Sequence, residues 1–323
     1  MAIDIRLSRE GERDAVLNFI KEMGFRPRDS VTWDALQMMA MTAWESGVLI
    51  GAIPMEPRVL QIAPDTTVKT VHETAVAIHP EFRSHGIGTE MQQAIFSTAP
   101  TGAVLATVFR EQPESPAYRW YRKNGFEPVM HIESWFYDHP VPFPLQNAEV
   151  YDEHDPCLNW ASLTALWEQA HLNWSGGFLD RCERPLREWL RVHPYRKIYT
   201  FTIIILRDAQ KNLRGYAVLG VGKMNSETER VDILELVTIL EEPHEVDMLL
   251  QAIITFASTH AFRPIRWPLA RYDPNRKIAK RYGMEERWNF DFMVREMRRP
   301  SKPVLDLSVQ TKHSWRYFSI EYI

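Results

Sequence analysis

Short apolar runs separated by polar turns predict alternating strands and helices along the first half of the chain. Residues 4–7 alternate polar and apolar side chains like a short strand. Apolar residues between 15 and 20 recur at helical spacing, with Ser8 as the expected N-cap, and a Met-rich stretch within 26–47 favours a second helix. The later runs predict, in order, strands at 48–53, 59–62 and 71–78, a helix at 89–96, a strand at 103–109, a helix at 116–124 and a strand pair within 126–137 broken near Pro128.

The order of elements returns in the second half, which predicts a tandem repeat. The run 216–221 echoes 48–53, and 231–237 takes the place of the strand that ends at Ile78. We therefore expect an α/β (α+β layered) chain of two similar folds, each a mixed, mostly antiparallel sheet flanked by helices. The expected boundaries are a first domain at 1–138, a Pro-rich linker at 139–148, a second domain at 149–300 and a tail at 301–323.

Composition narrows the classes of partner. A formal net charge of −4 over 323 residues gives no global attraction to polyanions, which argues against nucleic acid. No secretory signal is present, and no stretch has the roughly 18–20 apolar residues that cross a bilayer, so we expect a cytoplasmic protein without a membrane partner. Cys157 and Cys182 are too few and too far apart for a disulfide framework or a zinc site, so no metal is expected.

A glycine-containing loop at 83–88 lies between a predicted strand and a predicted helix. Such a turn holds a diphosphate because its backbone N–H groups converge, glycine allows close approach, and the helix N-terminus carries partial positive charge. Arg83 adds a full positive charge. The pattern Arg-x-x-Gly-x-Gly is weakly specific when it stands alone.

Two stretches together resemble the GNAT acyltransferases. The run 76–88, with its apolar strand, Pro80, and Arg83-x-x-Gly-x-Gly, looks like the acetyl-CoA motif of that family. Downstream, Tyr121 stands four residues before Gly125, as in the family's second hallmark. The resemblance covers about the first 140 residues strongly and the rest only in layout, and it implies two tandem GNAT-like folds.

By this resemblance, the cofactor is acetyl-CoA as a co-substrate. The amides of the 83–89 loop would bind its diphosphate, and the strand before the loop would pair with its pantetheine arm. The expected binding residues are Val76, Ala77, Ile78, Arg83, Ser84, His85, Gly86, Ile87, Gly88 and Thr89. These are chiefly backbone roles, so we expect changes at Gly86 or Gly88 to matter more than a change at Ile87, because a Cβ there would block the phosphate.

Acetyl transfer needs a neutral amine and a proton for the departing thiolate. By motif, Tyr121 would give that proton; the alternative is a tyrosine that only packs under the cofactor. Family members often carry a glutamate base at the positions that are Thr74 and His72 here. Glu73 would point to the other face of a regular strand, although a bulge would reverse this. His72 as base, Glu73 attracting a cationic amine, and a water-mediated route all stay open.

The second copy departs from the motif. Pro243 and four carboxylates replace the glycine loop, and Ala279 stands four residues before Gly283, where the first copy has tyrosine. We expect no CoA there. The carboxylates are Glu241, Glu242, Glu245 and Asp247.

An active and an inactive GNAT fold in tandem resemble the first two domains of the enhanced intracellular survival family, whose members acetylate amines. That family's third domain and catalytic terminal carboxylate do not transfer, because only about 20 residues follow the second copy. The tail 315–323 alternates loosely like a strand and could pair with a sheet edge of this chain or of a neighbour, so a homodimer is one option.

These features predict an N-acetyltransferase that moves an acetyl group from acetyl-CoA to a primary amine of a small molecule, by direct attack in a ternary complex. The alternative is a non-catalytic protein that binds or senses acetyl-CoA. Asp34 and Glu56 are further candidates for attracting an amine, and segment 167–195 is a candidate cover for the cleft of the first domain.

Overall fold

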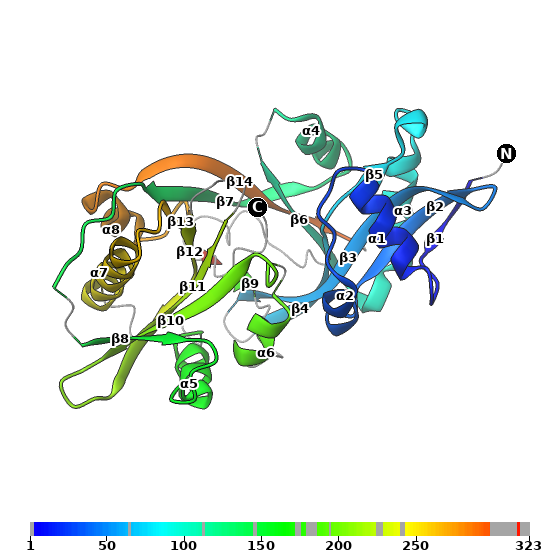
Figure 1. Ribbon diagram of the computed structural model, residues 1–323. Helices are drawn as coiled ribbons and strands as arrows, with labels where there is room; N and C mark the ends of the chain where they lie inside the picture. Colours follow the sequence, from blue (N-terminus) through cyan, green and yellow to red (C-terminus); the bar gives the residue numbers. More distant parts are fainter. Residues whose placement is uncertain are drawn as a thin grey trace. The chain divides into compact units, whose positions relative to one another are not determined.

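The structure is a computed structural model that divides into two compact units. It describes residues 3–63, 66–111, 114–144, 147–171, 176–178, 186–193, 195–223, 229–239, 243–297 and 315–316 (Figure 1). The first unit comprises residues 1–60, 67–129 and 291–307, and the second comprises 61–66, 130–290 and 308–323. Both units are therefore discontinuous in sequence. Among the described helices, none is long and apolar enough to span a membrane.

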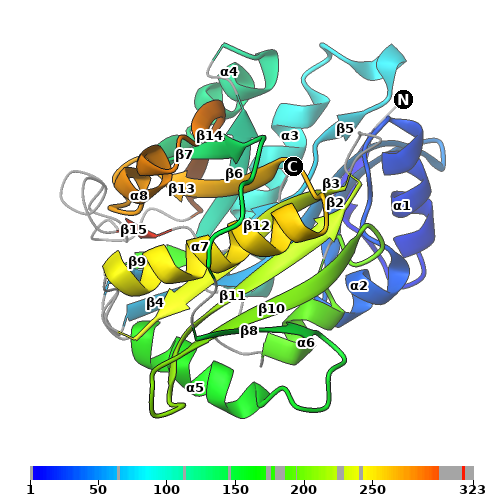
Figure 2. The ribbon, with the colours of Figure 1, turned by 60° about the vertical axis from the view of Figure 1, so that its left-hand side comes forward.

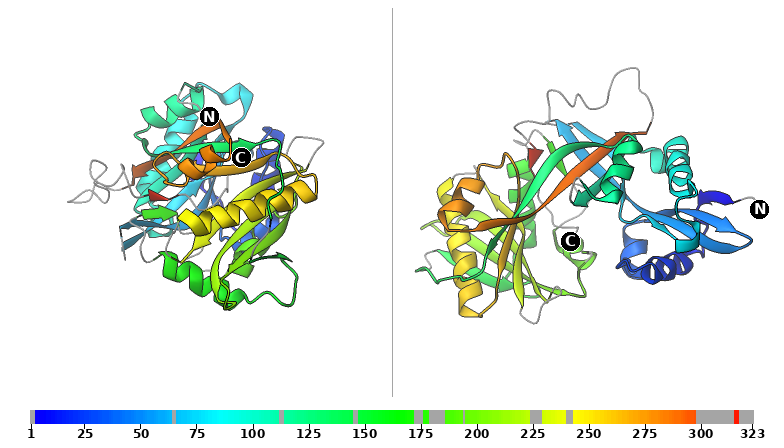
Figure 3. Two further views of the ribbon diagram at one scale, coloured as in Figure 1. Left: turned by 90° about the vertical axis from the view of Figure 1, so that its left-hand side faces the viewer. Right: turned by 90° about the horizontal axis from the view of Figure 1, so that it is seen from above.

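The first unit is a sheet with helices on both faces. Its strands lie in the order β1, β2, β3, β4, β6, β14. In Figure 3, α1 and α2 lie on one face of this sheet and α3 on the other. The elements up to residue 137 are β1 (Asp4–Leu7), α1 (Arg13–Glu22), α2 (Ser30–Ala35), β2 (Met39–Glu45), β3 (Val48–Ala63), β4 (Thr66–Glu73), β5 (Ala77–Ile78), the 3₁₀ turn Pro80–Phe82, α3 (Ile87–Thr98), the 3₁₀ turn Pro100–Gly102, β6 (Leu105–Glu111), α4 (Pro116–Lys123) and β7 (Glu127–Tyr137).

The first helix begins later than its cap signal predicted. Ser8 is not the N-cap, because its N–H donates to the Ala40 carbonyl at 2.8 Å and its Oγ accepts the Ala40 N–H at 3.1 Å. These bonds hold Ser8 against β2, and the N-cap of α1 is Glu12. A long-range pairing has outweighed a local capping preference.

Three strand predictions also change. Met39 and Met41 lie in β2 rather than in a helix, and Met41 is fully buried in the core. The runs 48–53 and 59–62 form one strand, β3, and 127–137 is a single strand despite Pro128. By contrast, the predicted strand 71–78 is interrupted, because β4 ends at Glu73 and β5 resumes at Ala77.

A strand from the far end of the chain completes the first unit. In β14 (Glu285–Glu296), residues 291–296 belong to this unit and lie next to β6. The Met297 N–H donates to the Val104 carbonyl at 2.9 Å. Met293 and Met297 pack in the core with residues of α3 and α4. The expected boundary at 138 is therefore incomplete, because the chain supplies this strand only after residue 290.

The second unit repeats the architecture. Its strands lie in the order β7, β13, β12, β11, β10, β8, and α7 lies across β10, β11 and β12 (Figure 2). Residues of α7 and α8 share one apolar core with these strands. The elements are β8 (Ala148–Asp152), α5 (Trp160–His171), β9 (Gly176–Phe178), α6 (Leu186–Arg191), β10 (Tyr199–Arg207), β11 (Leu213–Gly222), β12 (Arg230–Thr238), α7 (Pro243–Thr259), β13 (Ile265–Ala270), α8 (Arg276–Arg281) and β15 (Trp315–Arg316).

The two units share one order of elements, as the sequence repeat predicted. The succession β4, α3, β6, α4 in the first corresponds to β12, α7, β13, α8 in the second. In both, the last helix is followed by a glycine in the left-handed region, Gly125 with φ 83° and Gly283 with φ 74°. Such a residue ends a helix without a Cβ clash, which explains why glycine stands at both places.

The linker and the tail are described only in part. Residues 139–144 form no helix or strand, although the Phe143 N–H donates to Thr255 Oγ1 at 2.9 Å. Trp315 and Arg316 pair in parallel with Gly176 and Gly177 of β9. Residues 317–323 and much of segment 167–195 lie outside the described residues, so a covering role for that segment stays a prediction.

We predict that residues 1–138 do not fold alone. The fragment lacks the strand that pairs with β6 and two core methionines, so an edge and apolar surface would be exposed. Thermal and urea unfolding followed by circular dichroism should show no cooperative transition for the fragment and a cooperative one for the whole chain. Adding 139–323 as a separate polypeptide should restore a transition. A sharp transition in the fragment alone would contradict this account.

Candidate active site

The hydrogen-bond ladder between β4 and β6 ends early. The two strands pair in parallel only from Thr70 and Leu105 to His72 and Thr107. Beyond that point β6 continues to Glu111. The segment after β4 continues into β5, which pairs with β3 so that Ile78 lies opposite Gly51. The backbones of β5 and the end of β6 therefore do not bond to each other. The Thr74 N–H donates to Pro54 and Ala77 pairs with β3, so only the groups of this segment that face away from β3 are left for another partner.

The backbone of Ile78 is directed away from β3. In an antiparallel pair the residues alternate between those that bond to the partner strand and those that face away. The His79 N–H donates to the Ile50 carbonyl at 2.9 Å, so Ala77 and His79 bond to β3, and Val76 and Ile78 face the opposite side. The outward backbone groups of Val76 and Ile78 suit pairing with an amide-bearing arm, which stays a prediction, while the backbone of Ala77 is engaged by β3.

The loop after β5 presents N–H groups at the start of α3. Thr89 and Glu90 both donate to the Gly86 carbonyl, at 2.9 and 3.0 Å, so the ladder of α3 starts there. The N–H groups of Gly86, Ile87 and Gly88 consequently have no acceptor within the helix. Arg83 is exposed, and its Nε donates to the Ile78 carbonyl at 3.0 Å, which ties the guanidinium to the end of β5. Amides and a cation therefore lie together, the combination that a phosphate needs.

The two glycines of the loop differ in conformation and surroundings. Gly86 has φ 85°, a conformation that other residues rarely adopt, and a Cβ there would meet only Glu90 Oε1 at 3.9 Å. A Cβ at Gly88 would lie 3.4 Å from Trp120 Cζ2 of α4. That distance is an ordinary van der Waals contact, so packing does not require glycine at position 88, and the expectation that a Cβ there would block a phosphate stays a prediction.

A buried polar cluster joins four elements beside this loop. Tyr121 of α4 is 1% exposed, and its hydroxyl donates to Glu73 Oε2 at 3.0 Å. Arg110 Nη2 of β6 donates to the same hydroxyl at 3.0 Å, and its guanidinium carbon lies 4.6 Å from the Tyr121 ring centroid. Gln92 Nε2 of α3 donates to Glu73 Oε1. Tyr121 and Glu73, which the sequence named separately, are direct partners.

The interruption after β4 explains why Glu73 faces the helices. A Cβ at Gly51 would meet Ile78 Cδ1 at 2.9 Å and Met91 Sδ at 3.0 Å, so the Ile78 side chain lies on the α3 face. Glu73 lies on that face as well, through Gln92 and Tyr121. In a regular strand, residues 73 and 78 would face opposite sides. The irregularity at 74–76 therefore reverses the alternation, the case that the sequence analysis had left open.

Burial sets the protonation of these groups. Burial raises the pKa of Glu73 to about 7, although hydrogen bonds from Gln92 and Tyr121 and the charges of Arg110 and Arg295 act in the other direction. Burial also raises the pKa of the Tyr121 hydroxyl, so it stays protonated at neutral pH. Burial and three arginines lower the pKa of His72 well below its ordinary value, and His72 Nδ1 lies 2.9 Å from Thr107 Oγ1. His72 is therefore neutral.

The other acidic candidates have partners within the protein. Asp34 is exposed and pairs with Arg13 at 2.5 Å. Glu56 is buried and pairs with Arg58 at 2.8 Å, with Arg28 at 3.7 Å. Because arginines already pair with both carboxylates, neither pairing supports a role for Asp34 or Glu56 in binding an amine. No group of three or more potential metal ligands is found among the described residues.

Sequence reasoning missed Arg110 and Gln92. Gln92 lies in α3 beside the core residues Met91 and Ile95 and is fully buried, and a polar residue on an apolar helix face was its only sequence signal. Arg110 follows a run of five buried residues in β6. Both partners come from elements other than β4 and α4, so no spacing rule connects them to Tyr121.

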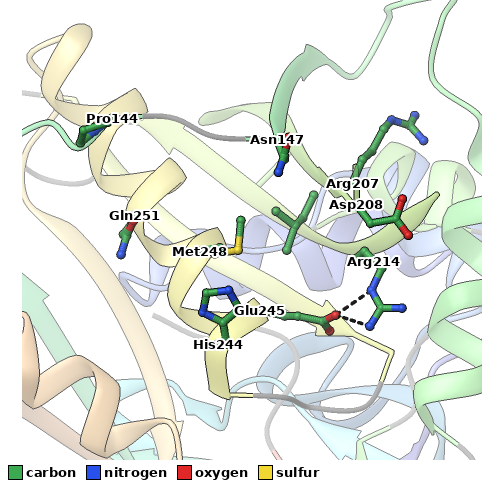
Figure 4. Close-up of a pocket in the computed structure, with 10 residues that line it drawn as sticks. Pro144, Asn147, Arg207, Asp208, Arg214, His244, Glu245, Met248 and Gln251 are labelled. Carbon is green, nitrogen blue, oxygen red and sulfur yellow. Dashed lines mark hydrogen bonds and ion pairs between the residues drawn. The ribbon is translucent and has the colours of Figure 1, made fainter. Parts of the chain in front are cut away.

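The corresponding place in the second unit has a different chemistry. Its helix α7 begins at Pro243, which has no N–H, and Glu245 in the first turn pairs with Arg214 at 2.6 Å (Figure 4). Asp247 accepts from the Tyr282 hydroxyl at 2.7 Å. Ala279 is fully buried in the core. Glu241 and Glu242 lie outside the described residues.

A pocket of about 510 Å³ lies beside that helix end. Figure 4 shows His244, Glu245 and Met248 of α7 on one side and Arg207, Asp208 and Arg214 on the other. The pocket combines both signs of charge.

Comparison with known proteins gives the class. Residues 41–128 match the profile of the acetyltransferase (GNAT) domain. No curated protein matches the sequence. Residues 41–128 therefore carry a GNAT acetyltransferase domain, which supports an acyltransferase.

Solved structures show the same fold at low sequence identity. A probable N-acyltransferase of unknown function from Enterococcus faecalis V583 superposes with a TM-score of 0.68 at 13% identity, over 92% of this chain and 73% of that chain. Eis1 from Mycobacterium abscessus superposes with a TM-score of 0.61 at 17% identity, over 92% of this chain and 74% of that chain. A tandem GNAT protein from the clavulanic acid biosynthesis pathway superposes with a TM-score of 0.59 at 14% identity, over 93% of this chain and 100% of that chain. The fold is that of a tandem GNAT protein, as expected.

We predict that Glu73→Gln stabilises the protein more at high pH than at low pH. The pKa of Glu73 rises on folding, so the native state binds more protons than the unfolded state between pH 4.5 and about 7, and stability falls as pH rises through that range. The shift corresponds to about 3 kcal/mol. The free energy of unfolding of Glu73→Gln minus that of the wild type should grow by about 2–3 kcal/mol from pH 5 to pH 8. Exposed Glu22→Gln is the control and should show no such trend; a constant difference for Glu73→Gln would argue against the raised pKa.

Proposed function

We propose that the first unit transfers an acetyl group from acetyl-CoA to a primary amine of a small molecule. The observation that carries this proposal is the placement of a buried tyrosine hydroxyl, that of Tyr121, on the same face of the sheet as the opening between β5 and β6 and the free N–H groups of α3. The GNAT domain at residues 41–128 supports the reaction class. The identity of the donor and of the acceptor is the proposed part.

The chain has groups that match the parts of acetyl-CoA. The N–H groups of Gly86, Ile87 and Gly88 and the Arg83 guanidinium suit a diphosphate. The backbones of Val76 and Ile78, directed away from β3, suit the two amides of a pantetheine arm. Both sets follow one another along the chain, so one extended ligand would meet them in sequence. The second unit lacks a comparable set among its described residues, and we expect one CoA per chain.

In the proposed reaction the neutral amine attacks the thioester carbon. The C–N bond forms, the C–S bond breaks, and the amine loses one proton. Tyr121 gives a proton to the sulfur, since the raised pKa of its hydroxyl keeps it protonated until thiolate appears. The pKa of His72 is lowered well below its ordinary value, and both oxygens of Glu73 accept hydrogen bonds from Gln92 and Tyr121. Neither group is placed to take the proton from the amine, so that proton leaves through water. This choice follows the water-mediated route among the options that the sequence left open.

We predict that Tyr121→Phe keeps acetyl-CoA binding and loses transfer. Removing a general acid typically lowers turnover by about 10²–10⁴-fold, and no phosphate contact is lost. Thiol release with a panel of amines and calorimetric titration with acetyl-CoA would measure the two effects. Tyr151→Phe in β8 of the second unit is the matched control, because its hydroxyl bonds to Glu149 at 2.8 Å and not to α4. A protein that binds acetyl-CoA equally before and after the change, with no transfer in either case, would be a sensor.

We predict that Arg83→Glu strongly weakens CoA binding. The change replaces a cation at the diphosphate position with an anion beside the loop amides, so the loss should be at least about tenfold and should weaken at high salt. Lys21→Glu makes the same charge change on exposed α1 and serves as the control. Equal CoA affinity in wild type, Arg83→Glu and Lys21→Glu would contradict the proposed diphosphate site.

A further inference from the structure

The hydroxyl of Tyr121 is held from two sides. A tyrosine hydroxyl has one proton and accepts up to two hydrogen bonds. Here the proton is directed at Glu73 Oε2, and one acceptor position is filled by Arg110 Nη2, each at 3.0 Å. While Glu73 is a carboxylate, it accepts that proton in a hydrogen bond. The same proton is then not directed at a thiolate.

Gln92 determines which oxygen of Glu73 can carry a proton. Its side-chain N–H donates to Oε1, and a donor at Oε1 disfavours a proton there. The remaining oxygen, Oε2, is the one in contact with Tyr121. A neutral Glu73 would therefore carry its proton on Oε2 and donate it to the Tyr121 oxygen. That arrangement fills both acceptor positions of the hydroxyl, with Glu73 and Arg110, and frees its own proton.

From this geometry, and resting on the proposed function, we infer that Glu73 and Arg110 are positioning residues that direct the Tyr121 proton, and that neutral Glu73 is the competent form. In that form the Tyr121 proton points to the departing sulfur. When the C–S bond breaks, the proton moves from the Tyr121 oxygen to sulfur. The negative charge left on the oxygen faces the Glu73 O–H and the Arg110 guanidinium. Tyr121 then regains a proton through Glu73, which takes one from water.

The surroundings of Glu73 fit such a role. The groups that face it are Tyr121 of α4, Gln92 of α3, Arg110 of β6 and, from β14, the charge of Arg295. The two arginines favour the carboxylate, and burial favours the neutral form. With a pKa of about 7, the neutral form is lost as pH rises through neutrality. The attacking amine must be neutral, which rising pH favours, so turnover should pass through a maximum as the pH is raised.

This role for Glu73 differs from that of a general base. A base must be a carboxylate when it acts, so it would gain activity as pH rises through 7 and would lose it on conversion to glutamine. A positioning residue acts as a hydrogen-bond donor, and a glutamine amide N–H also donates. The two roles therefore predict opposite results for one substitution.

The test compares Glu73→Gln with Glu73→Leu, which donates nothing, at pH 6 to 8. We expect kcat of the glutamine variant to fall by less than about tenfold and to lose the decline near pH 7, and kcat of the leucine variant to fall by at least about 10²-fold. For Arg110→Gln we expect kcat to fall at least about tenfold, with KM for acetyl-CoA unchanged and partial rescue in Arg110→Lys. Loss of more than 10²-fold in folded, CoA-binding Glu73→Gln would overturn the inference.

A second measurement does not depend on turnover. Infrared difference spectra of wild type minus Glu73→Gln show the carbonyl band of a neutral carboxyl, and we expect that band at pH 5.5 and its loss by pH 8.5. If the band is absent throughout, the inference fails even when amines are acetylated. If the band titrates near pH 7 and no amine is acetylated, the proposed function fails instead.

Discussion

The early end of hydrogen bonding between the parallel strands β4 and β6 is the constraint on which the site depends. The ladder stops at His72 and Thr107, and the chain then continues through β5, which still pairs with β3 but not with β6. This change leaves the outward backbone groups of Val76 and Ile78 without a strand partner, and it turns Glu73 toward α3 and α4. A regular strand through 71–78 would have closed the opening and placed Glu73 on the other face. One local irregularity thus creates both the place for an extended ligand and the contact between Glu73 and Tyr121.

Helix α4, which carries Tyr121, is held in place by a strand from near the end of the chain. Tyr118 of α4 bonds to Asp291, and Arg295 of β14 donates to the Asn124 carbonyl just after that helix and stacks on Phe96. The distance from Arg110 to the Tyr121 hydroxyl therefore depends on β14, which lies near the end of the sequence. The second unit in turn uses residues 132–137 of β7 to pair with β13. Each half of the sequence is thus incomplete alone, which gives a structural reason to keep a second copy that lacks the glycine loop.

The sequence allowed the loop, the order of elements and Tyr121 to be predicted, because these follow local rules. Gly86 and Gly125 occupy left-handed conformations that favour glycine, and a strand, turn and helix around Arg83 can be recognised from spacing. The failures have long-range causes. Ser8 does not cap the first helix, because it bonds to Ala40 instead. The pairing of Glu73 with Tyr121 depends on a strand irregularity that the sequence alone left open. Strand exchange has no local signature, because an apolar strand such as β14 matches the edge of either unit.

A buried carboxyl in an apolar core requires an explanation, since leucine would fill the same volume without desolvation. The proposed reaction provides one, because in it the Tyr121 oxygen bears negative charge when its proton leaves. A carboxylate at 3.0 Å would oppose that charge, whereas a neutral carboxyl and a guanidinium would both stabilise it. Burial raises the pKa of Glu73, whereas hydrogen bonds from Gln92 and Tyr121 and the charges of Arg110 and Arg295 lower it. Because these effects oppose each other, the carboxyl changes state near pH 7, and the strand exchanged from residues 291–296 contributes to where that change falls.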